Sequence, residues 1–573
     1  LKGSWKAGTT RTYKLSQKNS SWVYTLNQIS PSAVAYDKTQ ATYQIESYRQ
    51  APDGTKQDVA WKVIGYSVNN GTTWTTTKPW LKSLSKEQSN GGTAAEQLTA
   101  TLGTDIVDLL AQRNTELKEA TPLGNSSTYY NLSNATGAAA VQNTANCYVI
   151  SAPGYYMIPL VYGNAIKNSQ INSNAYISRA PVTKLQFGTT TTIKDVILHN
   201  FVDHQSAKIT SPWIEKTNGG ANNGIDGAEV TWSDESNLVE LANSPIYHDA
   251  SGNAFVKFEV KKGNLKSGNA VISVKKGTTI LWSWHLWFAP KNALDKITVT
   301  NNQGKKYDFT RETLGWKPTE WTGTSYSTPR TVMGKVEQVI GNNGDKQYAT
   351  ITITQNAGLT EKTGTTTLYQ WGRNNAFPGT DASLPQGIIY SSREDIDMNN
   401  KIQKPNYFFT TNILANETIA QNDGVTRLHY FYNLWSMDNN RRGDINAPNN
   451  IDVVKTIYDP CPVGFNVPTN GAFSGFTTST TNGTNVPATF ELNSGHIFWV
   501  NSSHTESIYF PASGFRNAKD AILKDALTSG NYWSADPQDY NNGCAMGFNK
   551  TEIKPLFRNI RTYGFAVRPV AEK

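Results

Sequence analysis

Residues 280–288 read Ile-Leu-Trp-Ser-Trp-His-Leu-Trp-Phe, a run that carries large side chains on both faces of an extended strand. Successive side chains of a strand point to opposite faces, so Trp282 and Trp284 share one face while His285 and Trp287 share the other. A strand that is bulky on both faces has to lie in the middle of a packed sheet. We therefore expect a central strand of a β-sandwich here, with His285 hydrogen-bonded inside the core. A binding role for His285 is the alternative.

The composition also favours a β-rich protein. Aromatic residues make up 11% of the chain and charged residues 17%, and the mean hydropathy is -0.50, so uncharged polar residues supply most of the polarity. Aromatic and β-branched side chains suit pleated surfaces, and Asn, Gly and Ser suit turns. The 573 residues exceed one core, and about three to five domains are expected. We expect a mainly β chain, with tandem immunoglobulin-like or β-sandwich domains ahead of a compact, loop-rich C-terminal block.

The charge pattern argues against a nucleic-acid partner. The formal net charge is +8, but Lys and Arg are scattered and form only isolated pairs such as Arg441 and Arg442. Proteins that bind nucleic acid gather these residues on one face or in one run. No apolar run is long enough to cross a membrane.

The chain has 3 Cys, at Cys147, Cys461 and Cys544, without the spacing of a zinc site. In an oxidising compartment Cys461 and Cys544 are the candidates for a disulfide, which would leave Cys147 free. Three buried thiols are the alternative, because sequence spacing does not reveal the distance between two side chains.

Changes in composition and turn signals divide the chain into five parts. We expect terminal strands of a preceding domain, an immunoglobulin-like sandwich with a linker helix, a β-sandwich, a small β domain or linker strands, and a compact C-terminal domain. These parts cover residues 1–30, 31–120, 121–298, 299–365 and 366–573, respectively. The linker helix is expected after Thr104, which can cap it, and the Gly- and Thr-rich residues 357–367 are expected to form a hinge.

The C-terminal part contains several ordered motifs. They are Asp-Pro-Cys-Pro-Val-Gly-Phe at 459–465, Phe-Pro-Ala-Ser-Gly-Phe-Arg at 510–516, Tyr-Trp-Ser-Ala at 532–535 and Gly-Phe-Ala-Val-Arg-Pro-Val at 564–570. Their order resembles the Fibrobacter succinogenes major paralogous domain, a C-type-lectin-like module. The resemblance covers about residues 366–573 and implies an α+β C-type-lectin-like fold. In many relatives a Cys follows the Val-Arg pair, whereas this chain has Pro569.

Upstream motifs resemble the central region of Bacteroides fimbrillin-family, Mfa1-like surface and pilus proteins. They lie at residues 145–148, 160–166 and 282–285, and the opening residues 3–9 resemble the closing strands of a pilin domain. The resemblance implies lipoprotein export, an extracellular place on the bacterial outer-membrane surface or in a fimbrium, and other pilin subunits as partners. It also implies that a membrane contact would use an N-terminal lipid anchor that this chain does not contain.

A lectin-like domain implies a glycan or protein ligand on a host or microbial surface. The candidate ligand-binding residues combine exposed aromatic rings with a polar loop, and they are Trp435, Asp438, Asn439, Arg442, Asp444, Trp533 and Asp536. For the two tryptophans core packing is the alternative. Calcium is a possible cofactor because it needs several oxygen ligands, with Asp438, Asp444, Asn446 and Asp452 as candidates; a polar loop without metal is the alternative.

No catalytic motif stands out along the chain, so we expect no enzyme. The sequence favours a fimbrial adhesin, at the pilus tip or elsewhere on the surface, that binds through its C-terminal lectin-like part. A structural pilus subunit without its own ligand is one alternative. A carbohydrate-active surface lipoprotein is another, and it predicts a deep acidic cleft with a pair of carboxylates.

Overall fold

The computed structural model shows a chain built mainly from strands. It describes residues 8, 22–177, 184–186, 193–195, 201–339, 346–358, 361–393, 398–410, 434–437, 445–476, 490–491, 494–500, 506–538 and 542–573. Strands account for 46% and helices for 7% of the residues, which confirms the mainly β prediction. The chain divides into two compact units, the first made of residues 1–108 and 322–360 and the second of residues 109–321 and 361–573.

The first unit contains a sheet with the order β1 (Val23–Ile29), β2 (Gln40–Gln50), β7 (Gly92–Leu102) and β5 (Leu81–Leu84), and β3 (Lys56–Asp58) also pairs with β2. Every second side chain of β2 is buried over its first eight residues, so one face of this strand enters the core. This alternation of buried and exposed side chains is typical of a strand at the surface of a sandwich.

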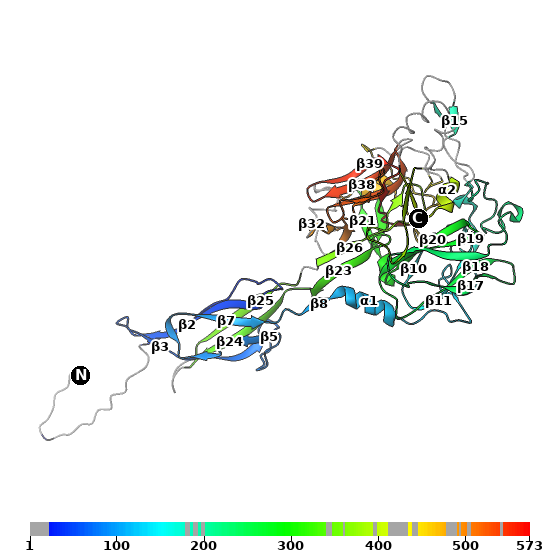
Figure 1. The fold of residues 1–573 in the computed structure, drawn as a ribbon. Helices are drawn as coiled ribbons and strands as arrows, with labels where there is room; N and C mark the ends of the chain where they lie inside the picture. Colours follow the sequence, from blue (N-terminus) through cyan, green and yellow to red (C-terminus); the bar gives the residue numbers. More distant parts are fainter. Residues whose placement is uncertain are drawn as a thin grey trace. The chain divides into compact units, whose positions relative to one another are not determined.

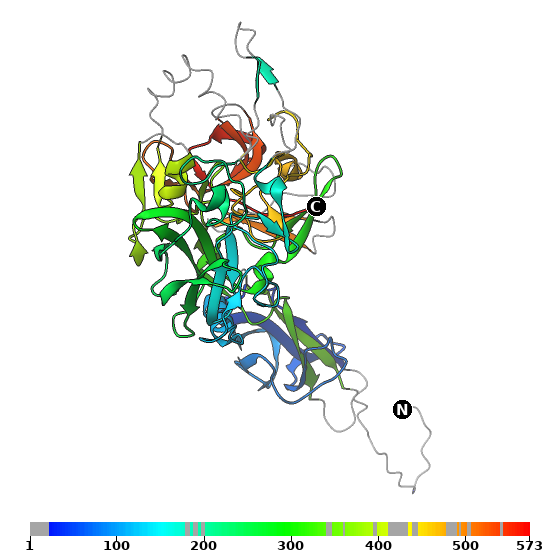
Figure 2. The same ribbon diagram turned by 90° about the vertical axis from the view of Figure 1, so that its right-hand side faces the viewer.

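A second sheet completes the first unit. Its order is β25 (Tyr348–Gln355), β24 (Arg330–Gln338), β4 (Trp61–Ser67) and β6 (Gln88–Ser89). Buried residues of both sheets form one hydrophobic core, and Figures 1 and 2 both show the green strands of residues 330–355 beside the blue strands of the same unit. The expected separate domain over 299–365 is thus corrected, because β24 and β25 supply two of the four strands of this second sheet of the N-terminal sandwich.

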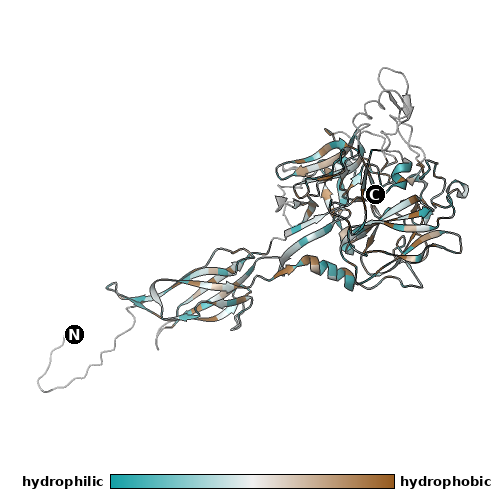
Figure 3. Ribbon diagram, viewed as in Figure 1, coloured by the Kyte–Doolittle hydropathy of each residue, from teal (hydrophilic) through white to brown (hydrophobic). Residues whose placement is uncertain are grey.

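The segment around the expected linker helix also differs from the prediction. The helix α1 covers Leu109–Glu119, whereas the residues just before it form the short strand β8 (Ile106–Asp108). Thr104 is therefore not its cap. Strand β8 pairs with β23 (Lys317–Thr324), and Asp108 lies opposite Thr322 in the register. Figure 3 shows the apolar beginning of α1 in brown and its polar remainder in teal.

The second unit begins with two sheets that share one core. The first has the order β10 (Cys147–Ile150), β20 (Thr279–Phe288), β19 (Gly268–Lys276), β16 (Gly227–Ser233) and β28 (Gln386–Gly387). The second has the order β17 (Glu240–His248), β18 (Ala254–Val260), β11 (Gly154–Pro159) and β9 (Tyr130–Asn131). Strand β20 lies inside its sheet and its last eight side chains are buried, which confirms the expected central strand.

His285, on β20, is buried and hydrogen-bonded inside the core, as predicted. Its Nε2 lies 3.0 Å from Asn269 Oδ1 and its Nδ1 lies 3.1 Å from the Tyr369 hydroxyl. The amide oxygen of Asn269 can only accept, so Nε2 carries the proton and Nδ1 accepts from the tyrosine. Burial lowers the pKa of His285 to about 3, so the ring is neutral.

The C-terminal residues of the second unit form several smaller sheets. One has the order β21 (Lys296–Thr300), β22 (Lys306–Thr310), β41 (Val570–Ala571) and β31 (Phe465–Asn466). Another has the order β37 (Ser529–Pro537), β38 (Asn542–Asn549) and β39 (Ile553–Ile560). The largest core holds both Trp284 and Trp533, so the expected boundaries at 298 and 365 do not separate compact units.

Helices of the part of the chain that the structure describes are all too short or too polar to span a membrane.

Candidate functional site

A cavity of about 440 Å³ opens in the second unit, a size ordinary for small-ligand sites. Its walls come from α1, from the segment that connects β22 to β23, from β26 (Glu361–Thr365), and from β33 (Gly495–Trp499) and β34 (Ser507–Pro511). The lining residues are Leu109, Gln112, Arg113, Glu116, Pro290, Asn292, Ile297, Arg311, Glu312, Thr313, Trp316, Trp321, Lys362, Ile497, Ser507, Tyr509, Pro511 and Arg568.

One wall is fixed by a buried ion pair. Arg113, on the cavity-lining side of α1, donates to both carboxylate oxygens of Glu312 at 2.6 and 2.7 Å, and its Nε donates to Ser267 at 2.9 Å. Both charged side chains are more than 90% buried. The two-pronged geometry is the strong form of such a pair, and it joins α1 to the segment after β22.

A second buried cation, Arg568, holds the segment after β22 together with β34. Its guanidinium donates to the backbone oxygens of Thr310 at 2.8 Å, Tyr509 at 2.8 Å and Arg311 at 2.5 Å, and to the Thr313 hydroxyl at 3.0 Å. Burial lowers the pKa of Arg568 to about 10, which leaves it charged near neutral pH. This residue is the Arg of the Val-Arg-Pro motif. Its contacts give the motif a structural role, because the guanidinium binds backbone oxygens of neighbouring segments.

Lys362, on β26, places its ammonium among three aromatic rings. Its Nζ lies 4.4 Å from the Trp321 ring centroid, 5.0 Å from that of Tyr509 and 5.4 Å from that of Trp316. Burial lowers the pKa of Lys362 to about 8, the charges of Arg113, Arg568 and Arg311 add to this effect, and Glu312 opposes it. Among the described residues Lys362 has neither an ion pair nor a hydrogen bond.

Two indole N–H groups of the same cavity also lack a partner. The Nε1 atoms of Trp316 and Trp321 are buried and make no hydrogen bond to any described residue. A buried donor without an acceptor destabilises the folded state by about 1–3 kcal/mol. Their burial keeps both N–H groups away from a ligand in the cavity, so of these groups only the Lys362 ammonium could meet one there.

The tryptophans expected to bind ligand lie instead in the core. Trp435 is fully buried, donates to the Tyr458 backbone oxygen at 3.1 Å and packs against Trp371. Trp533 is also fully buried, donates to the Tyr369 backbone oxygen at 2.8 Å and stacks on Phe565 at 4.2 Å between centroids. The core-packing alternative is therefore correct for both rings.

Asp536, the third expected ligand residue that the structure describes, is buried and fully engaged. It accepts from Asn449 Nδ2 at 2.6 Å, from the Thr469 hydroxyl at 2.8 Å and from the Asn470 amide at 2.5 Å. These contacts fasten one loop to another and leave no face for a ligand. Its expected ligand role is therefore corrected to a structural one.

The expected calcium loop is described only in part. Asp438, Asn439, Arg442 and Asp444 lie outside the described residues. Asn446 is exposed, and the Asp452 carboxylate forms ion pairs with Lys305 at 2.6 Å and Lys573 at 3.8 Å. In the described part of the chain no cluster of three or more His, Cys, Asp or Glu residues is arranged to hold a metal.

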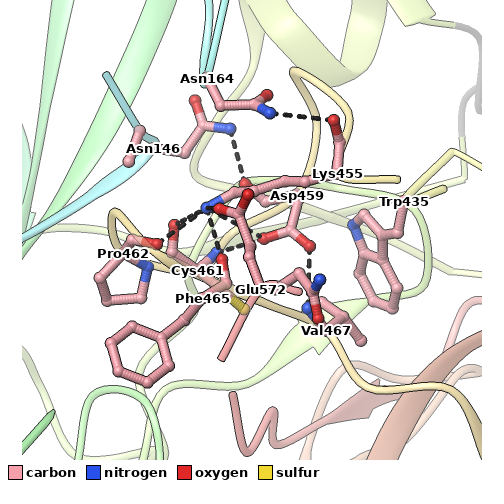
Figure 4. A network of polar contacts seen from close by, with 12 residues as sticks. Asn146, Asn164, Trp435, Lys455, Asp459, Cys461, Pro462, Phe465, Val467 and Glu572 are labelled. Carbon is pink, nitrogen blue, oxygen red and sulfur yellow. Dashed lines mark hydrogen bonds and ion pairs between the residues drawn. The ribbon is translucent and has the colours of Figure 1, made fainter. Parts of the chain in front are cut away.

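The Asp-Pro-Cys-Pro motif forms a buried polar network, shown in Figure 4. Asp459 accepts the backbone amides of Cys461 at 2.7 Å and Val467 at 2.9 Å. The Lys455 ammonium donates to the backbone oxygens of Cys461 at 3.0 Å, Pro462 at 2.8 Å and Phe465 at 2.6 Å. These three bonds use all three of its protons. Burial raises the pKa of Asp459, while Lys455 and the amides oppose this shift. The network therefore fixes the loop and presents no free group to solvent.

Asparagines of the upstream motifs complete this network. Asn146 donates to the backbone oxygens of Ile457 at 2.6 Å and Asp459 at 2.8 Å, and Asn164 donates to that of Lys455 at 2.9 Å (Figure 4). The two groups of motifs, hundreds of positions apart in the sequence, thus meet in one structural feature.

The three cysteines are all buried and free. The expected bond between Cys461 and Cys544 is therefore absent from the structure, and the alternative of three buried thiols describes it. Burial raises the thiol pKa of Cys147 and Cys461 above the usual range, which disfavours the reactive thiolate.

The residues that the sequence analysis missed are those of the cavity. Lys362 lies in the stretch expected to be a hinge, which is strand β26 in the structure. Thr363 and Thr365 favour extended structure, but the glycines of this stretch indicated a hinge instead. Arg113 and Glu312 are 199 positions apart, and no local pattern relates them.

A family model described as a domain of unknown function (DUF8237) matches residues 490–570. This stretch supplies the cavity residues Ile497, Ser507, Tyr509, Pro511 and Arg568. No curated protein and no solved structure matches the chain.

Proposed function

We propose that this protein is a cell-surface adhesin that binds a glycan in the cavity beside α1, β26 and β34. The observation that carries the proposal is the ring of Trp316, Trp321 and Tyr509 around an ammonium group without an ion pair. Apolar walls with a few polar groups are typical of ligand sites. Aromatic faces offer the apolar area on which the C–H face of a sugar ring can pack.

An extracellular place on the bacterial outer-membrane surface, in a fimbrium or beside it, is part of the proposal. It is supported by the resemblance of the upstream motifs to fimbrillin-family proteins. The two motif groups also meet in one buried network, so they belong to a single structural unit. Other pilin subunits are the proposed assembly partners, and a lipid anchor is the proposed membrane attachment.

The charges of the cavity favour binding over glycoside hydrolysis. Hydrolysis of this kind requires two carboxyl groups placed on either side of the scissile bond. In this cavity Glu312 is buried and held by Arg113 through both oxygens, and Glu116 is exposed on α1. Both oxygens of Glu312 accept from Arg113, so this carboxylate is already engaged and is not free to act on a scissile bond.

The test uses the full chain on a glycan array with neutral and acidic sugars, and compares it with Trp321→Ala. The matched control is Trp74→Ala in the first unit, where Lys335 lies over the Trp74 ring at 5.7 Å in a similar arrangement. We expect selective glycan binding that Trp321→Ala abolishes and Trp74→Ala preserves, with circular dichroism verifying that both variants fold. Absence of glycan binding by the unmodified chain would refute the proposal and favour the structural pilus subunit.

A further inference from the structure

The cavity carries an excess of positive charge. Arg113, Arg311, Lys362 and Arg568 line it, whereas Glu116 and Glu312 are its only carboxylates among the described lining residues. Such a balance in a partly enclosed site attracts anions, because charges in a low-dielectric setting are weakly screened.

Three of these four cations already have partners. Arg113 is paired with Glu312, and Arg568 donates to backbone oxygens and a hydroxyl. Arg311 lies 3.4 Å from Asp295 in a solvent-exposed pair.

Lys362 differs from the other three cations because its ammonium lies near three ring faces and has no ion-pair or hydrogen-bond partner among the described residues. The faces of Trp321, Tyr509 and Trp316 attract the positive charge, but they supply none of the oxygen acceptors that three N–H groups require. An ammonium group is a donor, so the partner that suits it is a ligand with acceptor oxygens.

We infer that the ligand is an anionic saccharide whose carboxylate or sulfate group is held by the Lys362 ammonium, while a ring of the sugar packs on Trp321. This inference rests on the proposed function and specifies its ligand. An anion at this point would offset the burial that lowers the pKa of Lys362, since an opposite charge favours the protonated amine.

The test measures affinities of the full chain for paired oligosaccharides by calorimetry. A galacturonate oligomer is compared with its methyl ester, and a sulfated galactose oligomer with its desulfated form, so that the two arms distinguish carboxylate from sulfate. The variants are Lys362→Met, Lys362→Arg and, as matched control, Lys335→Met, whose ammonium lies 4.7 Å from the Tyr348 ring in the first unit.

We expect the charged member of at least one pair to bind more tightly, and Lys362→Met to weaken it by about tenfold or more, the size of a lost charge-assisted hydrogen bond. Lys362→Arg should keep most of the affinity and Lys335→Met all of it. Equal binding of charged and neutral members, unchanged in Lys362→Met but lost in Trp321→Ala, would overturn the inference and leave the adhesin proposal standing. No binding of any glycan would overturn both.

Discussion

Arg113 and Glu312 face each other through two hydrogen bonds of 2.6 and 2.7 Å, and together they join α1 to the segment that forms the far wall of the cavity. Both side chains are more than 90% buried, so water can solvate little of either charge. The shape of the cavity therefore depends on this pair.

Glu312→Gln should lower the free energy of unfolding by about 3–5 kcal/mol, because it leaves the Arg113 charge buried without its partner. The exposed pair of Lys554 and Glu552, 3.0 Å apart, supplies the control, and Glu552→Gln should change stability by less than about 1 kcal/mol. Chemical denaturation measures both. The double variant Arg113→Met with Glu312→Met should be more stable than Glu312→Gln. Equal losses for the buried and the exposed pair would contradict this account.

Thiol titration should find three free cysteines per chain after denaturation without a reductant, and almost none before it. Burial keeps Cys147, Cys461 and Cys544 away from the reagent, and the raised pKa of the first two thiols further disfavours reaction. Ellman's reagent with mass spectrometry provides the measurement. A single reactive thiol in the denatured, non-reduced protein would instead indicate a disulfide.

Acid should destabilise the protein partly through His285. Its pKa falls from 6.5 to about 3 on folding, so below 6.5 the unfolded chain binds a proton that the folded chain does not. Stability is therefore lost as pH falls from 6.5 towards 3. His285→Gln should be less stable near neutral pH by about 1–3 kcal/mol through its lost hydrogen bonds, but its stability should fall less on acidification. Urea denaturation across this pH range tests both statements. An equal change of the free energy of unfolding with pH in the unmodified chain and in His285→Gln would contradict them.

Affinity for the anionic saccharide should decline as pH rises above about 8, where free Lys362 loses its proton. The affinity should level off above the pKa of Lys362 in the complex, which the bound anion raises. The charges of Arg113, Arg311 and Arg568 lower the pKa of free Lys362, and the charge of Glu312 raises it. Lys362→Arg should bind with little pH dependence in this range, because a guanidinium stays charged. Calorimetry at several pH values would detect the difference, and an identical decline in the arginine variant would assign it to another group.

Local patterns were sufficient to predict many strands but not their partners. The bulky residues 280–288, for example, predicted β20. Pairing of β24 with β4 depends on contacts between distant parts of the chain, which no local pattern encodes. The expected domain boundaries therefore differed from the two compact units, although the strands themselves were present.

The candidate site was even harder to predict from local patterns, because it is formed by residues that are distant in the sequence. Tryptophan is a residue type that often forms binding platforms, but whether the rings of Trp435 and Trp533 are buried or exposed depends on the elements that cover them. Lys362 and Trp321 come together only because β26 and β23 are neighbours in a sheet. A single lysine in a Thr-rich stretch carries no local sign of such an arrangement.

The register that sets Asp108 opposite Thr322 has a consequence for the order in which the chain folds. Residues 109–321 form one long connection between two parts of the N-terminal sandwich. The two ends of this connection must come together before β24 can pair with β4. Closing a flexible loop costs more entropy as it lengthens, by about 0.6 kcal/mol for each doubling. The pairing of β8 with β23 holds these two ends together and so meets that cost, which means that it should form before β24 joins β4.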